Sequence, residues 1–160
     1  MMTDLQEMQQ RPNDYDRLYT EDEVWDNFAY FIKAITPTLK EYGVRIALHP
    51  NDPPIPTLCG VGSLIHNMDG YRRAIALDPE GVMGIKLCVG CWLEGGASFG
   101  DILSDIKELV SEDRILLVHF RNVSSTLPYF EETLAEDGYA DMYAIMKAIY
   151  DTCPDTYVRP

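Results

Sequence analysis

One pattern occurs three times in this sequence: a short apolar segment is followed, near its carboxyl end, by a side chain that can bind a metal ion. The longest example is RILLVHFRNV (residues 114–123), which contains His119. VRIALHP leads to His49, and VMGIKLCVG leads to Cys88. Apolar runs of this length are typical of strands buried on both faces of a parallel sheet. The pattern therefore predicts an α/β fold that presents three metal-binding side chains at its strand ends.

Helical signals lie between the predicted strands. Thr20 with Glu23 three residues later forms a capping box, which predicts that a helix begins there. Pro37 is expected to kink or split this helix, and Gly43 to end it. Further helices are predicted around residues 68–77, 99–109 and 142–149. We expect loops in the segments HPNDPPIPTLCGVGS, VGCWLEGGASFG and NVSSTLPYFEETLAEDGYAD, and a fourth strand in TYVRP.

The spacing of the three candidate ligands matches a repeating βα unit. His49 and Cys88 are 39 positions apart, and Cys88 and His119 are 31 positions apart. A (β/α)8 barrel of about 250 residues uses roughly 30 residues per unit and places its active site at the carboxyl ends of its strands. We therefore expect a partial TIM (β/α)8 barrel of about four βα units. Residues 20–160 would form this C-terminal half, and residues 1–19 a polar, loop-like lead-in.

The acidic composition argues against several classes of partner. The 160 residues include 26 Asp and Glu against 13 Lys and Arg, which gives a net charge of -13. Such a charge repels nucleic acid and anionic membrane surfaces. No apolar run approaches the roughly 20 residues of a membrane helix, and the start of the sequence lacks the apolar core of a signal peptide. We expect a cytoplasmic protein without nucleic-acid or membrane partners, whose four cysteines are free thiols or ligands.

Two histidines and a cysteine form a chemically coherent set of ligands. They can hold a divalent cation, and a carboxylate as fourth ligand would leave positions open for substrate. These residue types alone do not distinguish zinc from other metals. A single histidine at a strand end is more often a hydrogen-bonded structural residue, but three such side chains at equivalent strand ends favour a metal site. Alternatively, Cys88 and Cys91 form a C-x-x-C redox or zinc pair, although the sequence has no second pair.

Arg121 and Asn122 follow His119 closely and are predicted to bind substrate. An arginine fork at this position could hold the carboxylate of a small acid. The alternative for Arg121 is a salt bridge at the rim of the barrel.

Four motifs resemble the mannonate dehydratase family. HPNDPP begins at His49, LCVG supplies a C-x-G element at Cys88, VHFRNV surrounds His119, and DGYADM begins at Asp137. The resemblance covers most of residues 20–160. It implies a xylose-isomerase-like TIM barrel that uses Mn²⁺ or Fe²⁺ to remove water from D-mannonate, a small sugar acid, giving 2-keto-3-deoxy-D-gluconate in hexuronate and glucuronate catabolism. It also implies that His49, Cys88 and His119 are three of the four protein ligands of this metal.

The sequence differs from the family pattern in two respects. Members usually carry Ser or Thr where this chain has Cys91. The family also continues beyond an Arg-Pro pair with an Asp-His pair, which supplies the fourth ligand and a catalytic histidine, whereas this sequence ends at Pro160. We therefore expect the catalytic acid and base to lie outside these residues, and the chain alone to bind metal weakly and lack dehydratase activity. Exposed strand edges could also support a homo-oligomer.

Two other functions are compatible with the same pattern. A metal-dependent sugar isomerase or epimerase on this type of barrel would also use histidines at strand ends. Such sites are usually richer in Glu and Asp than the cysteine-containing set found here. The third hypothesis is a non-catalytic barrel fragment that kept the fold and lost the site.

Overall fold

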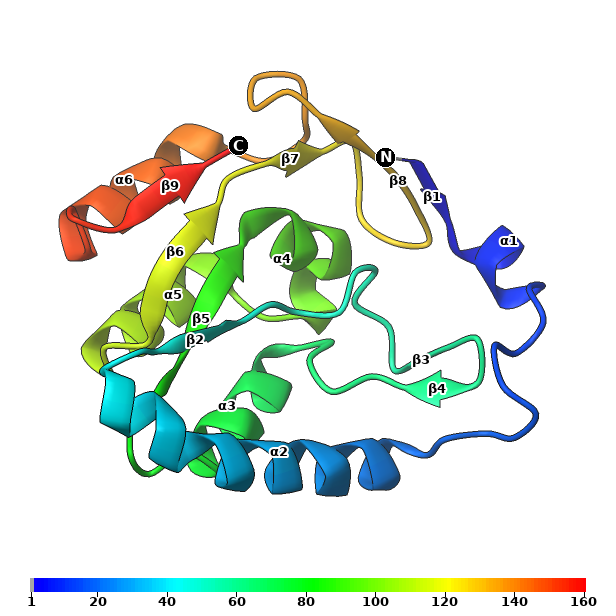
Figure 1. Cartoon of the computed structure of the whole chain (residues 1–160). Coiled ribbons are helices and arrows are strands. Elements are labelled where there is room, and N and C mark those ends of the chain that lie inside the picture. The colour runs from blue at the N-terminus through cyan, green and yellow to red at the C-terminus, as the bar shows by residue number, and fades with distance from the viewer. Residues whose placement is uncertain (1) are drawn as a thin grey trace.

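A four-stranded parallel sheet forms the centre of the molecule, as the computed structural model of residues 2–160 shows (Figure 1). Each strand pairs with its neighbour in parallel, and the pairs are separated in sequence by helices. The strand order is β2 (Ile46–Leu48), β5 (Met83–Cys88), β6 (Ile115–His119) and β9 (Tyr157–Arg159). All four strands were predicted, and the α/β fold with a parallel sheet is confirmed.

Burial differs strongly between the strands of this sheet. β5 has five buried residues and one half-buried residue, Lys86, whereas all three residues of β9 are exposed. The prediction that residues 115–120 are buried on both faces is wrong, because in β6 Val118 is buried but Ile115, Leu116 and Leu117 are only half-buried. The reason is position, since β6 lies next to the exposed strand β9 at one side of the sheet.

Four helices alternate with the strands and contribute apolar residues to the core. In each, the residue before the first turn accepts a hydrogen bond from a backbone N–H of that turn, which satisfies one of the free donors there. Within residues 2–160, no helix combines the length and the apolar character needed to cross a membrane. The helices are α2 (Glu21–Tyr42), α3 (Met68–Ala76), α5 (Ile102–Ser111) and α6 (Met142–Thr152).

The capping box that begins α2 is confirmed, with Thr20 and Glu23 in reciprocal hydrogen bonds. Gly43 ends the helix at a φ of 60°, a left-handed conformation that suits glycine. The expectation that Pro37 splits the helix is wrong, because α2 continues through it. A proline removes one backbone hydrogen bond, and the burial of Trp25, Ile32 and Leu39 on one side of the helix offsets that loss.

The glycine-rich segment after β5 is a helix rather than the predicted loop. It forms α4 (Val89–Gly95), followed by a 3-10 turn, η1 (Gly96–Ser98). Tertiary packing overrides the low helix propensity of its glycines, because six of the seven α4 residues are buried. The ring of Trp92 stacks on Tyr71 with centroids 5.4 Å apart and lies 4.3 Å from Phe99.

Strand pairing also orders segments that were predicted to be loops. The N-terminal residues form β1 (Met2–Asp4) and α1 (Leu5–Gln9), and β1 pairs with β8 (Tyr129–Thr133), which in turn pairs with β7 (Asn122–Val123). The expectation of a loop-like lead-in is therefore wrong for residues 2–9. The proline-rich segment after β2 contains a small hairpin of β3 (Thr57–Leu58) and β4 (Val61–Gly62).

Candidate metal centre

The three candidate ligands lie together at the carboxyl edge of the sheet. His49 follows the last residue of β2, while Cys88 ends β5 and His119 ends β6. Cys88 and His119 are direct partners in the parallel register between β5 and β6. Because all strands run in the same direction, their carboxyl ends meet at one edge of the sheet, as Figure 1 shows.

The ligand atoms of these residues are close enough to share one cation. One nitrogen of each histidine and the Cys88 Sγ all lie within 4.8 Å of one another. Cys88 Sγ is 3.3 Å from His119 Nδ1, and the two imidazole rings have centroids 6.3 Å apart. The cysteine is buried, whereas both histidines are half-buried and therefore reachable from solvent. The structure thus brings together the residues that the sequence singled out.

Hydrogen bonds around Cys88 stabilise its thiolate form. They lower the pKa of Cys88 to about 3, chiefly through the hydrogen bond from the Cys91 side chain. A hydrogen bond with His49 and the charge of Arg121 act in the same direction, against the effect of burial. The hydrogen bond with Cys88 also raises the pKa of His49. A thiolate beside imidazole nitrogens is a donor set that divalent transition metals bind.

The orientation of His49 suits a ligand. Its Nδ1 lies 2.8 Å from the carbonyl oxygen of Pro50, and this contact requires a proton on Nδ1 because a carbonyl only accepts. A histidine that donates one ring nitrogen to a backbone carbonyl keeps its ring orientation fixed and leaves Nε2 for a metal.

Next to the candidate ligands, a buried arginine sits among three carboxylates. Arg121 Nη2 lies 2.7 Å from an oxygen of Asp52 and 2.6 Å from an oxygen of Glu94, and Nη1 lies 3.0 Å from an oxygen of Glu132. Arg121 is 7% exposed and Glu94 is fully buried. These ion pairs match the alternative interpretation of Arg121, a salt bridge at the strand ends. Its role in substrate binding stays a prediction.

Burial near Arg121 changes the acidity of Glu94. Desolvation, together with the charge of Asp52, raises the pKa of Glu94 to about 8 despite the nearby guanidinium. Within residues 2–160, neither Glu94 carboxyl oxygen accepts a hydrogen bond of normal geometry. Asp52, Cys91 and Glu94 could by their spacing hold a cation of their own, but the Arg121 guanidinium already lies against all three side chains.

Asn122 is buried, and backbone groups use its side chain. Its amide nitrogen donates to the carbonyl oxygens of Ala135 and Ala140, and its oxygen accepts from the backbone N–H of Val123. A Cβ at position 138 would lie 2.1 Å from the Asn122 side chain, so Gly138 leaves the room that this contact needs. The contact with Ala140 joins β7 to the DGYADM segment. These contacts lend no support to substrate binding by Asn122, which stays untested.

Analysis of the sequence missed the acidic partners of Arg121. Asp52 lies within the HPNDPP motif, but no role was assigned to it. Glu94 was placed in a loop, although it belongs to α4 and faces Arg121. Glu132 lies in β8, a strand that was not predicted. The available signal was charge: a buried arginine after a strand needs acidic partners, and HPNDPP offers one at the neighbouring strand end.

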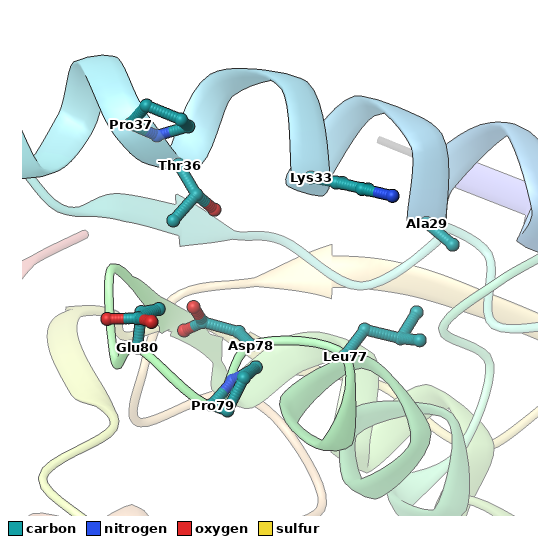
Figure 2. Close-up of a pocket in the computed structure, with 8 residues that line it drawn as sticks. All are labelled: Ala29, Lys33, Thr36, Pro37, Leu77, Asp78, Pro79 and Glu80. Atoms are coloured by element: carbon teal, nitrogen blue, oxygen red, sulfur yellow. The ribbon is translucent and has the colours of Figure 1, made fainter.

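Two surface hollows lie at different distances from the candidate metal centre. A groove of about 390 Å³ lies between α2 and the turn at residues 77–80. Figure 2 shows the side chains that line it. This turn precedes β5, so the groove lies at the opposite end of the sheet. Its lining contains no histidine or cysteine. A second hollow, of about 280 Å³, is lined by His119, Arg121 and Glu132 among others. The second hollow therefore borders the candidate metal centre through His119.

Comparisons with known proteins agree with these features. The sequence model of the D-mannonate dehydratase (UxuA) family matches residues 2–160. A mannonate dehydratase of Lactococcus lactis subsp. cremoris is 36% identical over 140 residues, which cover 84% of this chain and 38% of the relative. A mannonate dehydratase of Streptococcus suis is 34% identical over 157 residues, covering 97% of this chain and 42% of the relative.

A solved structure gives the same result. The crystal structure of a mannonate dehydratase from Streptococcus suis serotype 2 superposes with a TM-score of 0.78 at 34% identity, covering 88% of this chain and 40% of that chain. The present chain spans about two fifths of the length of the relatives it matches. With the family match over nearly all its residues, this chain belongs to the D-mannonate dehydratase (UxuA) family.

Proposed function

We propose that this chain contributes the metal-binding part of an active site that removes water from D-mannonate to give 2-keto-3-deoxy-D-gluconate. The observation that carries this proposal is the convergence of His49, Cys88 and His119, whose ligand atoms lie within 4.8 Å of one another at the strand ends. Family membership supplies the reaction and the substrate, a small sugar acid. All three relatives described above are mannonate dehydratases, which favours this reaction over that of a sugar isomerase or epimerase.

The donor set fits the divalent cation that the resemblance implies, Mn²⁺ or Fe²⁺. His49 and His119 would offer imidazole nitrogens and Cys88 a thiolate, all from rigid positions at strand ends. When bound, such a cation acts as a Lewis acid that stabilises the negative charge developing on the substrate during loss of water. The half-buried histidines leave one side of the site open toward the hollow beside His119, where the sugar acid would bind. Arg121 lines this hollow, and the proposal that it and Asn122 contact the substrate stands as a prediction.

We also propose that the sheet is part of a (β/α)8 barrel of the xylose-isomerase type. The parallel strands, the helices between them and the site at the carboxyl ends support this architecture. β2 and β9 each have a neighbour on one side among the described residues, so further strands could pair with their free edges. The same edges could support a homo-oligomer, which light scattering would detect. A reducing cytoplasm is the proposed location, because it keeps a thiolate ligand such as Cys88 reduced.

Metal content tests the proposed site. The chain is dialysed to equilibrium against Mn²⁺ and, separately, against Co²⁺, and the metal bound per chain at equilibrium is measured. We expect His119→Ala and Cys88→Ala to lose most of the metal bound by the wild-type chain, because each removes one of three ligands. His66→Ala is the matched control, since His66 is the third histidine and lies outside the cluster.

The two possible outcomes are distinct. Equal metal content in the wild-type chain and all three variants would contradict the proposal and favour a non-catalytic fragment. An assay with D-mannonate adds a second check: the chain alone should give no measurable dehydration, because it spans only about two fifths of the length of the relatives it matches.

A further inference from the structure

Each segment that carries a candidate ligand also carries a second functional side chain two or three positions later. These second residues contact one another in a neighbouring cluster. The pairs are His49 with Asp52, Cys88 with Cys91, and His119 with Arg121.

Arg121 is the centre of that neighbouring cluster. Its Nη2 donates a hydrogen bond to Asp52 at 2.7 Å and lies 3.8 Å from the Cys91 sulfur. The same nitrogen lies 2.6 Å from Glu94, in the helix that also holds Cys91. One guanidinium therefore contacts the segment after β2 and the helix after β5, while its own backbone follows β6. These are the three segments that hold the candidate ligands.

The backbone also fits closely around Arg121. A Cβ added at position 90 would lie 2.5 Å from Arg121 Cζ and 2.6 Å from Nε, so a side chain there would displace the guanidinium. Gly90 lies between Cys88 and Cys91 in the sequence. The absence of a side chain at this position lets the first turn of α4 rest directly against the arginine.

The shape of the guanidinium suits this task. It is planar, carries five N–H donors in a fixed arrangement and stays charged when buried, so it can bind several acidic groups in set directions. A lysine ammonium is a compact point charge on a flexible stem and cannot reproduce these directions. Three carboxyl groups lie within 3.0 Å of the guanidinium nitrogens of Arg121.

We propose that Arg121 is a positioning residue for the metal site, which fixes the separation of His49, Cys88 and His119 by joining the three segments that carry them. Its ion pairs connect the segments that follow the strand ends. This inference rests on the proposed metal site and goes beyond it, because it assigns the precision of the site to a residue that is not a ligand. It also differs from substrate binding, since it predicts an effect on metal affinity when no substrate is present.

Co²⁺ titration of the chain without substrate tests the inference. Cobalt bound to a thiolate gives a sulfur-to-metal charge-transfer band, which reports on the Cys88–metal contact. We expect Arg121→Lys to weaken Co²⁺ binding by about tenfold, within the range observed when groups that support a ligand are replaced, and to shift or weaken this band. Arg114→Lys is the matched control, because Arg114 is also an arginine paired with a buried carboxylate but lies at the other end of β6.

A second variant keeps the inference testable if Arg121→Lys does not fold. Asp52→Asn keeps Arg121 in place and removes the charge of one partner, so it should weaken Co²⁺ binding less than Arg121→Lys but more than Arg114→Lys. Thermal unfolding of every variant measures the structural effect separately. A stable Arg121→Lys chain with wild-type Co²⁺ affinity and spectrum would overturn the inference, as would wild-type binding by Asp52→Asn if Arg121→Lys failed to fold. In either case, loss of Co²⁺ by His119→Ala would leave the proposed metal site standing, and its retention would refute that site as well.

Discussion

An arginine that pairs with a buried carboxyl group lies at each end of β6, and the two are used differently. At the amino end, Arg114 Nη1 lies 3.0 Å from an oxygen of Asp78 and donates to the carbonyl oxygen of Met83 at 2.9 Å. The same carboxylate accepts hydrogen bonds from the backbone N–H groups of Val82 and Met83. This pair has one carboxylate for one guanidinium, and both groups are tied to the backbone.

At the carboxyl end, the charges do not balance in this way. Arg121 faces Asp52, Glu94 and Glu132, and the carboxyl oxygens of Glu94 accept no hydrogen bond of normal geometry from the described residues. Burial makes the ionised form of Glu94 costly, and the raised pKa of this group reflects that cost. The ion pair at the amino end of β6 therefore stabilises the fold. At the carboxyl end, burial of acidic groups beside the metal site lowers stability.

The largest expected effect concerns the amino end. Asp78→Asn removes the charge that balances Arg114 and should lower the free energy of unfolding by about 3 kcal/mol, as expected when one partner of a buried ion pair is lost. Urea unfolding measures this change. Asp151→Asn, in an exposed pair with Lys147, is the control and should cost less than about 1 kcal/mol. If Asp78→Asn lowered the free energy of unfolding no more than Asp151→Asn, the amino end of β6 would not differ from its carboxyl end in this way.

Replacing Glu94 should change how the free energy of unfolding depends on pH. Its pKa is raised to about 8, whereas a glutamate in an unfolded chain has a pKa of about 4.3. Between these values the unfolded state releases the proton and the folded state keeps it, so Glu94 lowers stability as the pH rises through this window. Glu94→Gln cannot ionise, so its free energy of unfolding should fall less between pH 5 and pH 8.

The difference between wild type and Glu94→Gln should therefore grow with pH, by on the order of 1 kcal/mol per pH unit at most. Urea unfolding at several pH values measures it, with the exposed Glu112→Gln as control. If the free energies of unfolding of wild type and Glu94→Gln changed equally with pH, ionisation of Glu94 would not destabilise the carboxyl end of β6.

The smallest expected effect is that of Cys91→Ser. A hydroxyl can donate a hydrogen bond to the Cys88 sulfur in place of the thiol, so Co²⁺ affinity should stay within about threefold of wild type. Cys153→Ser, outside the cluster, is the control. If Cys91→Ser lost Co²⁺ as completely as Cys88→Ala, Cys91 would itself be a ligand, and the division between the ligand cluster and the Arg121 cluster would be wrong.

The sequence predicted the residues that lie at the strand ends but not those that surround them. His49, Cys88 and His119 could be grouped because parallel strands bring their carboxyl ends together, and strand periodicity is visible in the sequence. Glu94 could not be grouped with Arg121, because α4 owes its helical form to burial rather than to helix-forming residues. β1 could not be predicted either. Its three residues, Met2–Asp4, give no strand signal, because their pairing with β8 depends on backbone hydrogen bonds.

The most direct test of the metal site is X-ray absorption at the cobalt edge of the Co²⁺-loaded chain. The arrangement of His49, Cys88 and His119 predicts one sulfur neighbour and two imidazole nitrogens around the ion, with the sulfur lost in Cys88→Ala. A shell of oxygen neighbours alone, unchanged in that variant, would show that the three residues do not form a metal site.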